Sequence, residues 1–67
     1  MQSSTQSDIR FLRLPDVKVI TGLSRSMIYK KISENDFPKQ INVGSNSVVW
    51  VKKDIDDWCD QVIEKAT

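Results

Sequence analysis

The sequence of 67 residues contains no histidine, one cysteine, two glycines and two prolines. Histidine is the commonest metal ligand and a frequent general base, so its absence argues against catalysis and against a metal site. A single cysteine cannot form an internal disulfide, which favours a reduced thiol and a cytoplasmic location. The scarcity of glycine and proline leaves most of the chain free to form helices and strands. These absences favour a binding domain over an enzyme.

Long apolar segments are also absent. No apolar run approaches the ~20 residues that span a membrane, and the N-terminus lacks the basic and then apolar layout of a signal peptide. A chain this short forms one domain, which buries only about 60% of the surface that its unfolded form exposes. Because residues 1–8 are almost entirely polar, we expect a disordered tail there and a single domain over residues 9–67.

The net charge of +1 conceals a strong asymmetry along the sequence. Residues 9–53 carry nine basic and three acidic side chains, whereas residues 54–67 carry one basic and five acidic side chains. A molecule with a basic body and an acidic end can turn its basic side toward a polyanion. Uneven charge is also common in small domains, so charge alone leaves both interpretations open.

Two short helices joined by a tight turn are predicted in the first half of the chain. Pro15 is suited to the first position of a helix, and Gly22 to the left-handed residue that follows its end. Ser24 then provides an N-cap for a second helix. Ile28 and Ile32, four residues apart, line one face of that helix, which should end near residues 34–36. This arrangement is typical of a helix-turn-helix.

The second half of the chain changes its pattern. Ile41 and Val43 alternate with the polar residues 40 and 42, and Val49 and Val51 alternate with residues 48 and 50. A four-residue polar loop, 44–47, lies between the two segments, which predicts a β-hairpin. The hairpin is followed by an amphipathic helix with apolar residues at helical spacing. A short strand or arm at residues 10–14 would precede the first helix. The element order predicts an α+β fold, a small winged helix-turn-helix. The apolar residues of the last helix are Ile55, Trp58, Cys59, Val62, Ile63 and Ala66.

Several motifs in this order resemble the AlpA family of phage and prophage regulators. They lie at residues 11–14, 22–30, 37–41 and 43–44, at Trp50 and at residues 54–58, so the resemblance covers about residues 10–63. It implies a fold like that of excisionases and of the DNA-binding part of MerR-type regulators. It also implies DNA binding on mobile elements, either as an activator of an integrase gene or as a recombination directionality factor.

The sequence departs from the family pattern at two positions. Family members often carry arginine at the wing tip, where this chain has Asn46, which retains hydrogen-bonding groups but lacks the positive charge. Members also often have serine or threonine just before the last helix, where this chain has Lys53. That helix is therefore expected to lack an N-cap, a loss of about 1 kcal/mol.

The second helix is the predicted recognition helix, because an α-helix fits the major groove and its first residues reach the base edges. Arg25 can contact a guanine or a phosphate there. We assign Tyr29 to the DNA-facing side, since Ile28 and Ile32 already define the buried side. Lys30 and Lys31 extend the positive surface, but a solvated helix face is the more usual place for isolated lysines. The predicted DNA-contacting residues are Thr21, Ser24, Arg25, Ser26, Tyr29, Lys30 and Lys31, with Asn42, Ser45, Asn46 and Ser47 in the hairpin.

The remaining notable side chains are expected to be structural. Trp50 and Trp58 are large enough to dominate the core of so small a domain, and Cys59 beside Trp58 is expected to be an inert thiol. The aspartates of residues 54–60 lack the glycine and the bidentate glutamate of an EF-hand loop, so we predict no metal site. No catalytic set of nucleophile, base and orienting residue is present in the sequence.

The sequence therefore predicts a sequence-specific DNA-binding protein of a prophage or integrative element, acting as a transcriptional regulator, an excisionase or both. Its partners would be double-stranded DNA and an integrase or RNA polymerase, without a cofactor or a membrane. We expect a monomer in solution that assembles cooperatively on DNA. The alternative is a small protein-interaction module that uses the same fold to bind a protein partner.

Overall fold

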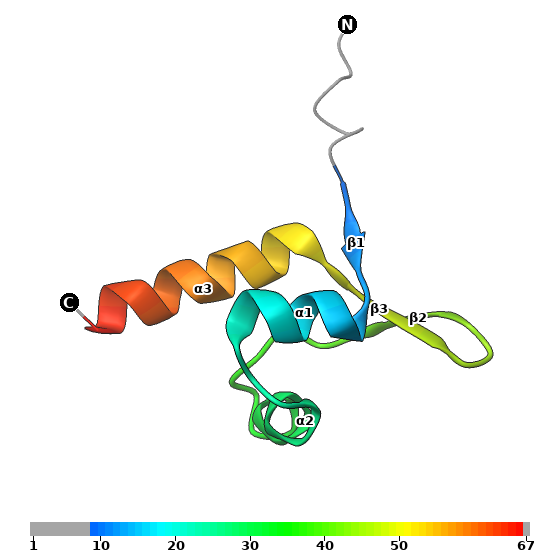
Figure 1. The fold of residues 1–67 in the computed structure, drawn as a ribbon, viewed down its shortest axis with the longest axis horizontal. Coiled ribbons are helices and arrows are strands. Elements are labelled where there is room, and N and C mark those ends of the chain that lie inside the picture. Colours follow the sequence, from blue (N-terminus) through cyan, green and yellow to red (C-terminus); the bar gives the residue numbers. More distant parts are fainter. Residues whose placement is uncertain (1–8, 67) are drawn as a thin grey trace, which may run out of the picture.

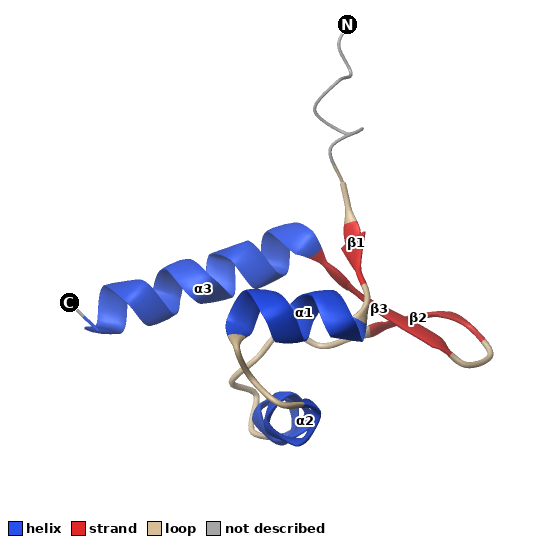
Figure 2. Ribbon diagram, in the orientation of Figure 1, coloured by secondary structure: helices blue, strands red, loops and turns tan. Residues whose placement is uncertain are grey.

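A computed structural model of the chain describes residues 9–66, which form three helices around a three-stranded antiparallel sheet (Figures 1 and 2). The predicted α+β winged helix-turn-helix is confirmed. The predicted disordered tail, residues 1–8, lies outside the described residues. In chain order the elements are β1 (Phe11–Leu12), α1 (Leu14–Thr21), α2 (Arg25–Ser33), β2 (Ile41–Gly44), β3 (Ser47–Val51) and α3 (Lys52–Ala66).

The turn between α1 and α2 has the predicted chemistry. Gly22 ends α1 with a left-handed backbone, φ 74°, a conformation that costs other residues more because of their Cβ. Ser24 is the N-cap of α2, and its hydroxyl accepts a hydrogen bond from the Met27 N–H at 3.2 Å. One boundary differs from the prediction. Helix α1 begins at Leu14, so Pro15 occupies its second position, where the missing N–H is still one that has no partner inside the helix.

The sheet has the strand order β1-β3-β2, so β3 is the central strand. On one side of β3, Val51 pairs with Phe11 of β1. On the other side, Val49 pairs with Ile41 of β2. The pairing of Gly44 with Ser47 shows that the hairpin turn contains two residues, 45 and 46. The prediction of a four-residue loop was wrong, because Gly44 and Ser47 form the last pair of the ladder. An irregularity in the register between residues 42 and 44 bends β2 at this end.

Helix α3 follows β3 without a linker and begins at Lys52. The prediction that Lys53 precedes this helix was wrong, so the argument for a missing cap at that position does not apply. The Lys52 N–H instead donates to the Arg10 carbonyl at 2.8 Å, which extends the β1–β3 contact into the helix. Its first turns also carry two ion pairs, the part-buried Lys52–Asp56 at 2.7 Å and the exposed Lys53–Asp57 at 3.0 Å.

The core lies where α1, α2 and α3 meet β3. It consists of five buried side chains from all three helices, the central strand and the linker before β2, with Leu12, Leu14, Leu23 and Trp58 among the partly buried residues around it. Trp50 is the largest fully buried side chain. Trp58 is only partly buried, so the prediction that both tryptophans belong to the core holds fully for Trp50 alone. The five are Val17, Ile28, Phe37, Trp50 and Ile55.

The second half of α3 extends past the core. Its 15 residues span about 22 Å, whereas the eight residues of α1 span about 12 Å. Val62 is 44% exposed and Ile63 is 61% exposed. The amphipathic pattern correctly predicted the helix, but the part of its apolar face that lies beyond the core is exposed, because α1 and α2 are too short to cover it (Figure 1).

Candidate nucleic-acid interface

The N-terminal end of α2 is exposed and polar. Ser24, Arg25 and Ser26 all lie on the surface, and the hydroxyls of the two serines are 3.3 Å apart. The Ser24 oxygen already accepts from the Met27 N–H, so its proton remains free to reach an outside acceptor or Ser26. Free backbone N–H groups at this helix end also favour a phosphate. The structure therefore brings together at one helix end the three residues that the sequence predicts to begin the recognition helix.

Arg25 is held over an aromatic ring. Its guanidinium carbon lies 5.7 Å from the centre of the Tyr29 ring, one turn further along α2. Tyr29 in turn packs its ring edge-to-face against Trp50, with ring centres 6.2 Å apart. The prediction that Tyr29 takes no part in core packing was wrong, because it is partly buried against the core. Buried Trp50 thus packs against Tyr29, and the Tyr29 ring in turn contacts the exposed guanidinium of Arg25.

Two of the predicted DNA-contacting residues, Thr21 and Lys31, have partners within the protein. The Thr21 hydroxyl donates a hydrogen bond to the Val17 carbonyl at 2.8 Å and accepts one from the Leu23 N–H at 3.2 Å. Both hydrogen bonds stabilise the end of α1 and the turn that follows it. Lys31 forms an ion pair with Asp36 at 3.6 Å, and only 25% of its side chain is exposed. Lys30, by contrast, is exposed on α2. Thr21 and Lys31 thus have contacts within the fold, and their contacts with DNA remain predictions.

The hairpin carries the other predicted residues. Asn42 lies exposed on β2, Ser45 and Asn46 form the turn, and Ser47 is half-buried where β3 begins. Figure 1 shows the hairpin projecting from the body on the side away from the C-terminal end of α3, in the position of a wing. All four side chains are polar and uncharged, so the wing can offer hydrogen bonds but no ion pair to a phosphate.

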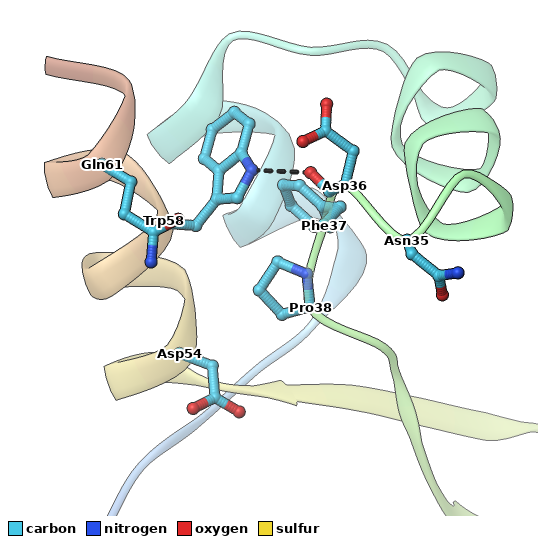
Figure 3. Close-up of a pocket in the computed structure, with 7 residues that line it drawn as sticks. All are labelled: Asn35, Asp36, Phe37, Pro38, Asp54, Trp58 and Gln61. Carbon is cyan, nitrogen blue, oxygen red and sulfur yellow. Dashed lines mark hydrogen bonds between the residues drawn. The ribbon is translucent and has the colours of Figure 1, made fainter. Parts of the chain in front are cut away.

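The linker that follows α2 is fixed by two indole groups. Trp50 donates its Nε1–H to the Pro38 carbonyl at 3.1 Å, and Trp58 donates its Nε1–H to the Asp36 carbonyl at 2.8 Å. Figure 3 shows Trp58 reaching from α3 across a hollow to this linker, where its ring packs edge-to-face on Phe37 with centres 4.8 Å apart. This hollow is thus built by contacts that hold the end of α2. Its lining residues are Asn35, Asp36, Phe37, Pro38, Asp54, Trp58 and Gln61.

Other kinds of site find no support in the part of the chain that the structure describes. No group of three or more potential metal ligands occurs among residues 9–66. Partial burial raises the pKa of the Cys59 thiol, and the nearby Asp56 and Asp60 carboxylates raise that pKa further. The thiol therefore stays protonated near neutral pH, as expected for an unreactive cysteine. None of the helices within residues 9–66 has the length and apolar character required to span a membrane.

The packing of Trp50 against Tyr29, the ring that contacts Arg25, was not predicted from the sequence. The alternating pattern of β3 assigns neighbouring residues to opposite faces, so it gives no sign that Val49 and Trp50 are both buried. A signal was nevertheless present: Arg25 and Tyr29 are four residues apart, a spacing that places two side chains together on a helix surface.

The fold and the exposed end of α2 define a small winged helix-turn-helix protein. A family model described as "Prophage CP4-57 regulatory protein (AlpA)" matches residues 10–63, so the chain belongs to the AlpA family of prophage regulatory proteins. The resemblance seen in its motifs is thereby confirmed.

Two relatives share much of the sequence. The DNA-binding transcriptional activator AlpA of Escherichia coli K12 is 36% identical over 64 residues, covering 87% of this chain and 91% of that protein. The uncharacterized protein ORF88 of Enterobacteria phage P4 is 43% identical over 49 residues, covering 73% of this chain. The chain spans 56% of the length of the phage protein. No solved structure shows significant similarity to the chain.

Proposed function

We propose that this protein is a sequence-specific DNA-binding regulator of a prophage or integrative element, which inserts α2 into the major groove. The observation that carries the proposal is the arrangement at the start of α2, where an exposed arginine stands on an aromatic support between two serines. The relative in Escherichia coli named as a DNA-binding transcriptional activator supports the same function. A cytoplasmic location follows from this proposal, because the DNA target lies there.

Binding would divide between α2 and the hairpin. Arg25 is suited to a bidentate contact with guanine O6 and N7, while the serines and free N–H groups of α2 would hold a phosphate. Lys30, further along α2, would add a phosphate contact. Asn46 and its neighbours in the turn would reach the adjacent groove or backbone as a wing. Because the wing is uncharged, we expect α2 to provide most of the affinity.

The protein would act as a transcriptional regulator, as an excisionase that bends attachment-site DNA, or as both. Neither role requires the protein to catalyse a reaction. This agrees with a site that offers only hydrogen-bonding groups and the positive charge of Arg25. An integrase would be the partner in excision, and RNA polymerase the partner in activation. We further propose that the protein is a monomer in solution and that neighbouring copies bind DNA cooperatively, because one subunit of this size offers a small interface.

Footprinting tests this proposal on the DNA around the gene and around the nearest integrase attachment site. Protection at the attachment site is the result expected for an excisionase, and protection at a promoter alone is the result expected for a regulator. The Arg25→Ala variant should lose protection at the same protein concentration. The matched control is Lys65→Ala, which removes a cation from the last turn of α3, outside the proposed interface. Failure of the native protein to protect any duplex would overturn the proposal.

A further inference from the structure

The exposed half of α3 forms one wall of an apolar groove. The end of α1, Leu23 in the turn before α2, and Lys31 of α2 form the opposite wall. The groove measures about 490 Å³, within the range of about 300–1,000 Å³ typical of ligand sites. Three of its apolar side chains are well exposed: Ile20 is 42% exposed, Val62 44% and Ile63 61%. The lining residues are Ile20, Thr21, Leu23, Lys31, Trp58, Cys59, Val62 and Ile63.

A second exposed apolar surface lies on β2. All four residues of this edge strand are exposed, including Ile41 at 41% and Val43 at 52%. Lys39, also exposed, precedes the strand. Figure 1 places the hairpin and the C-terminal end of α3 at opposite ends of the longest axis of the molecule. The two apolar surfaces therefore cannot meet within one chain.

We propose that the groove beside α3 receives β2 of a second copy of this chain bound next to it on DNA. This inference rests on the DNA-binding function proposed above and identifies the surfaces through which neighbouring copies cooperate. The contact joins two different surfaces, so it repeats from copy to copy in one direction and produces a row of subunits.

Charge complementarity favours a second copy as the occupant. Residues 54–67, which include the exposed half of α3, carry a net charge of −4, whereas residues 9–53 carry +6. Lys31 lines the groove itself, so a neighbouring copy would have to place Lys39, which precedes β2, outside the groove and next to the exposed Asp60 of α3. A contact between two identical grooves would instead place two acidic helices against each other.

The small size of both surfaces also fits this occupant. Stable protein–protein interfaces bury about 1,200–2,000 Å² in total, but here only two or three large apolar side chains are exposed on each side. Such a contact is too weak to form dimers in solution at ordinary concentrations. DNA that holds two copies side by side raises their effective concentration, which makes a weak contact sufficient.

The orientation of α2 makes the row geometrically consistent. Figure 1 looks along the axis of α2, and a helix lying in the major groove crosses the duplex. The duplex would then run beneath the molecule, roughly from the α3 end to the hairpin end. The longest dimension of the molecule is 39 Å, close to one helical turn of about 34–36 Å, or 10–10.5 bp. Neighbouring copies should therefore occupy direct repeats about one turn apart.

The experiment compares binding to one site with binding to two. The probes are duplexes carrying one copy, or two direct repeats 10 or 15 bp apart, of the sequence that the native protein selects from a randomised pool. We expect the native protein to bind the 10-bp repeat cooperatively, with a gain of about 5–150-fold, the usual range of coupling between two sites. The 15-bp repeat, which places the second copy on the other side of the duplex, should show no gain.

Two double variants remove one surface each. Val62→Gln with Ile63→Gln alters the groove, and Ile41→Thr with Val43→Thr alters β2; all four side chains are exposed, so folding should persist. Each variant should bind a single site like the native protein and lose the cooperative gain. A mixture of the two should regain part of it, because a copy with an intact β2 can then dock on a copy with an intact groove. The matched control is Val19→Gln, an 84% exposed apolar residue outside the groove lining.

The results separate the two proposals. Absence of single-site binding by the native protein would overturn both the DNA-binding function and this inference. Normal single-site binding with an undiminished cooperative gain in either double variant would overturn the inference alone. So would loss of the gain without recovery in the mixture, since that outcome indicates a contact between like surfaces or with a different occupant.

Discussion

Tyr29 should influence DNA binding through Arg25 and not through its own hydroxyl. The contact between the guanidinium and the ring, at 5.7 Å, is exposed, and such contacts contribute about 0.5–1 kcal/mol. If the ring holds Arg25 in its bound orientation, Tyr29→Leu should raise the Kd about two- to fivefold. Tyr29→Phe keeps the ring and its edge contact with Trp50, so its Kd should stay close to that of the native protein.

A double-mutant cycle isolates this effect. Arg25→Ala should cost about 1–3 kcal/mol if the side chain makes a bidentate base contact. Once Arg25 is absent, Tyr29→Leu should weaken binding only slightly, which leaves a coupling energy of about 0.5–1 kcal/mol between the two positions. The measurement is fluorescence anisotropy on the selected duplex at one fixed salt concentration.

Stability must be measured beside affinity. Tyr29→Leu also removes an aromatic pair with Trp50, a loss of about 0.5–1.5 kcal/mol of folding free energy. Urea unfolding of each variant gives the folded fraction, by which the Kd is corrected. Equal effects of Tyr29→Leu with and without Arg25 would refute the proposed support. An unchanged Kd for Arg25→Ala would refute the placement of α2 in the groove.

Three further predictions concern the fold and the interface. Trp50→Ala should cost about 3–5 kcal/mol and abolish a cooperative urea transition, whereas Trp58→Ala, which exposes less core, should leave a weakened one; equal losses would contradict this ranking. Gly22→Ala should cost about 1–2 kcal/mol in thermal melts from its positive φ alone, since no atom lies within 4 Å of an added Cβ, and an unchanged melting temperature would show that the turn relaxes freely. Lys30→Ala should reduce the slope of log Kd against log salt by about one unit, and Lys31→Ala should leave it unchanged; the reverse result would place Lys31 on the DNA.

The sequence predicts the local features of the fold well because each depends on neighbouring residues. The cap at Ser24 and the left-handed Gly22 follow from backbone chemistry within one turn, and both are present. The helical spacing of residues 55–66 likewise predicts α3. Boundaries were less accurate: the two-residue hairpin turn and the start of α3 at Lys52 depend on how β3 pairs with both of its neighbours.

Features that depend on tertiary packing could not be predicted from periodicity. Tyr29 lies beside the face defined by Ile28, so its partial burial depends on the approach of Trp50, which lies in β3, 21 residues further along the chain. Lys31 and Lys30 are equivalent in the sequence, yet only Lys31 turns to Asp36. Val62 is exposed because α1 and α2 are short relative to α3. The apolar pattern of α3 alone does not predict how much of this helix its neighbours cover. The contacts with DNA themselves remain predictions.

The central position of β3 has a consequence for how the protein becomes active during synthesis. Phe11 pairs with Val51, and Trp50 of the same strand lies beneath Tyr29. Pairings between residues so distant in the sequence form late, since the intervening chain must first close into a loop. The helix-turn-helix leaves the ribosome early, but its second helix gains a fixed orientation only when β3 arrives. Under the proposed function, a nascent chain would therefore remain unable to bind DNA until almost the whole domain has been synthesised.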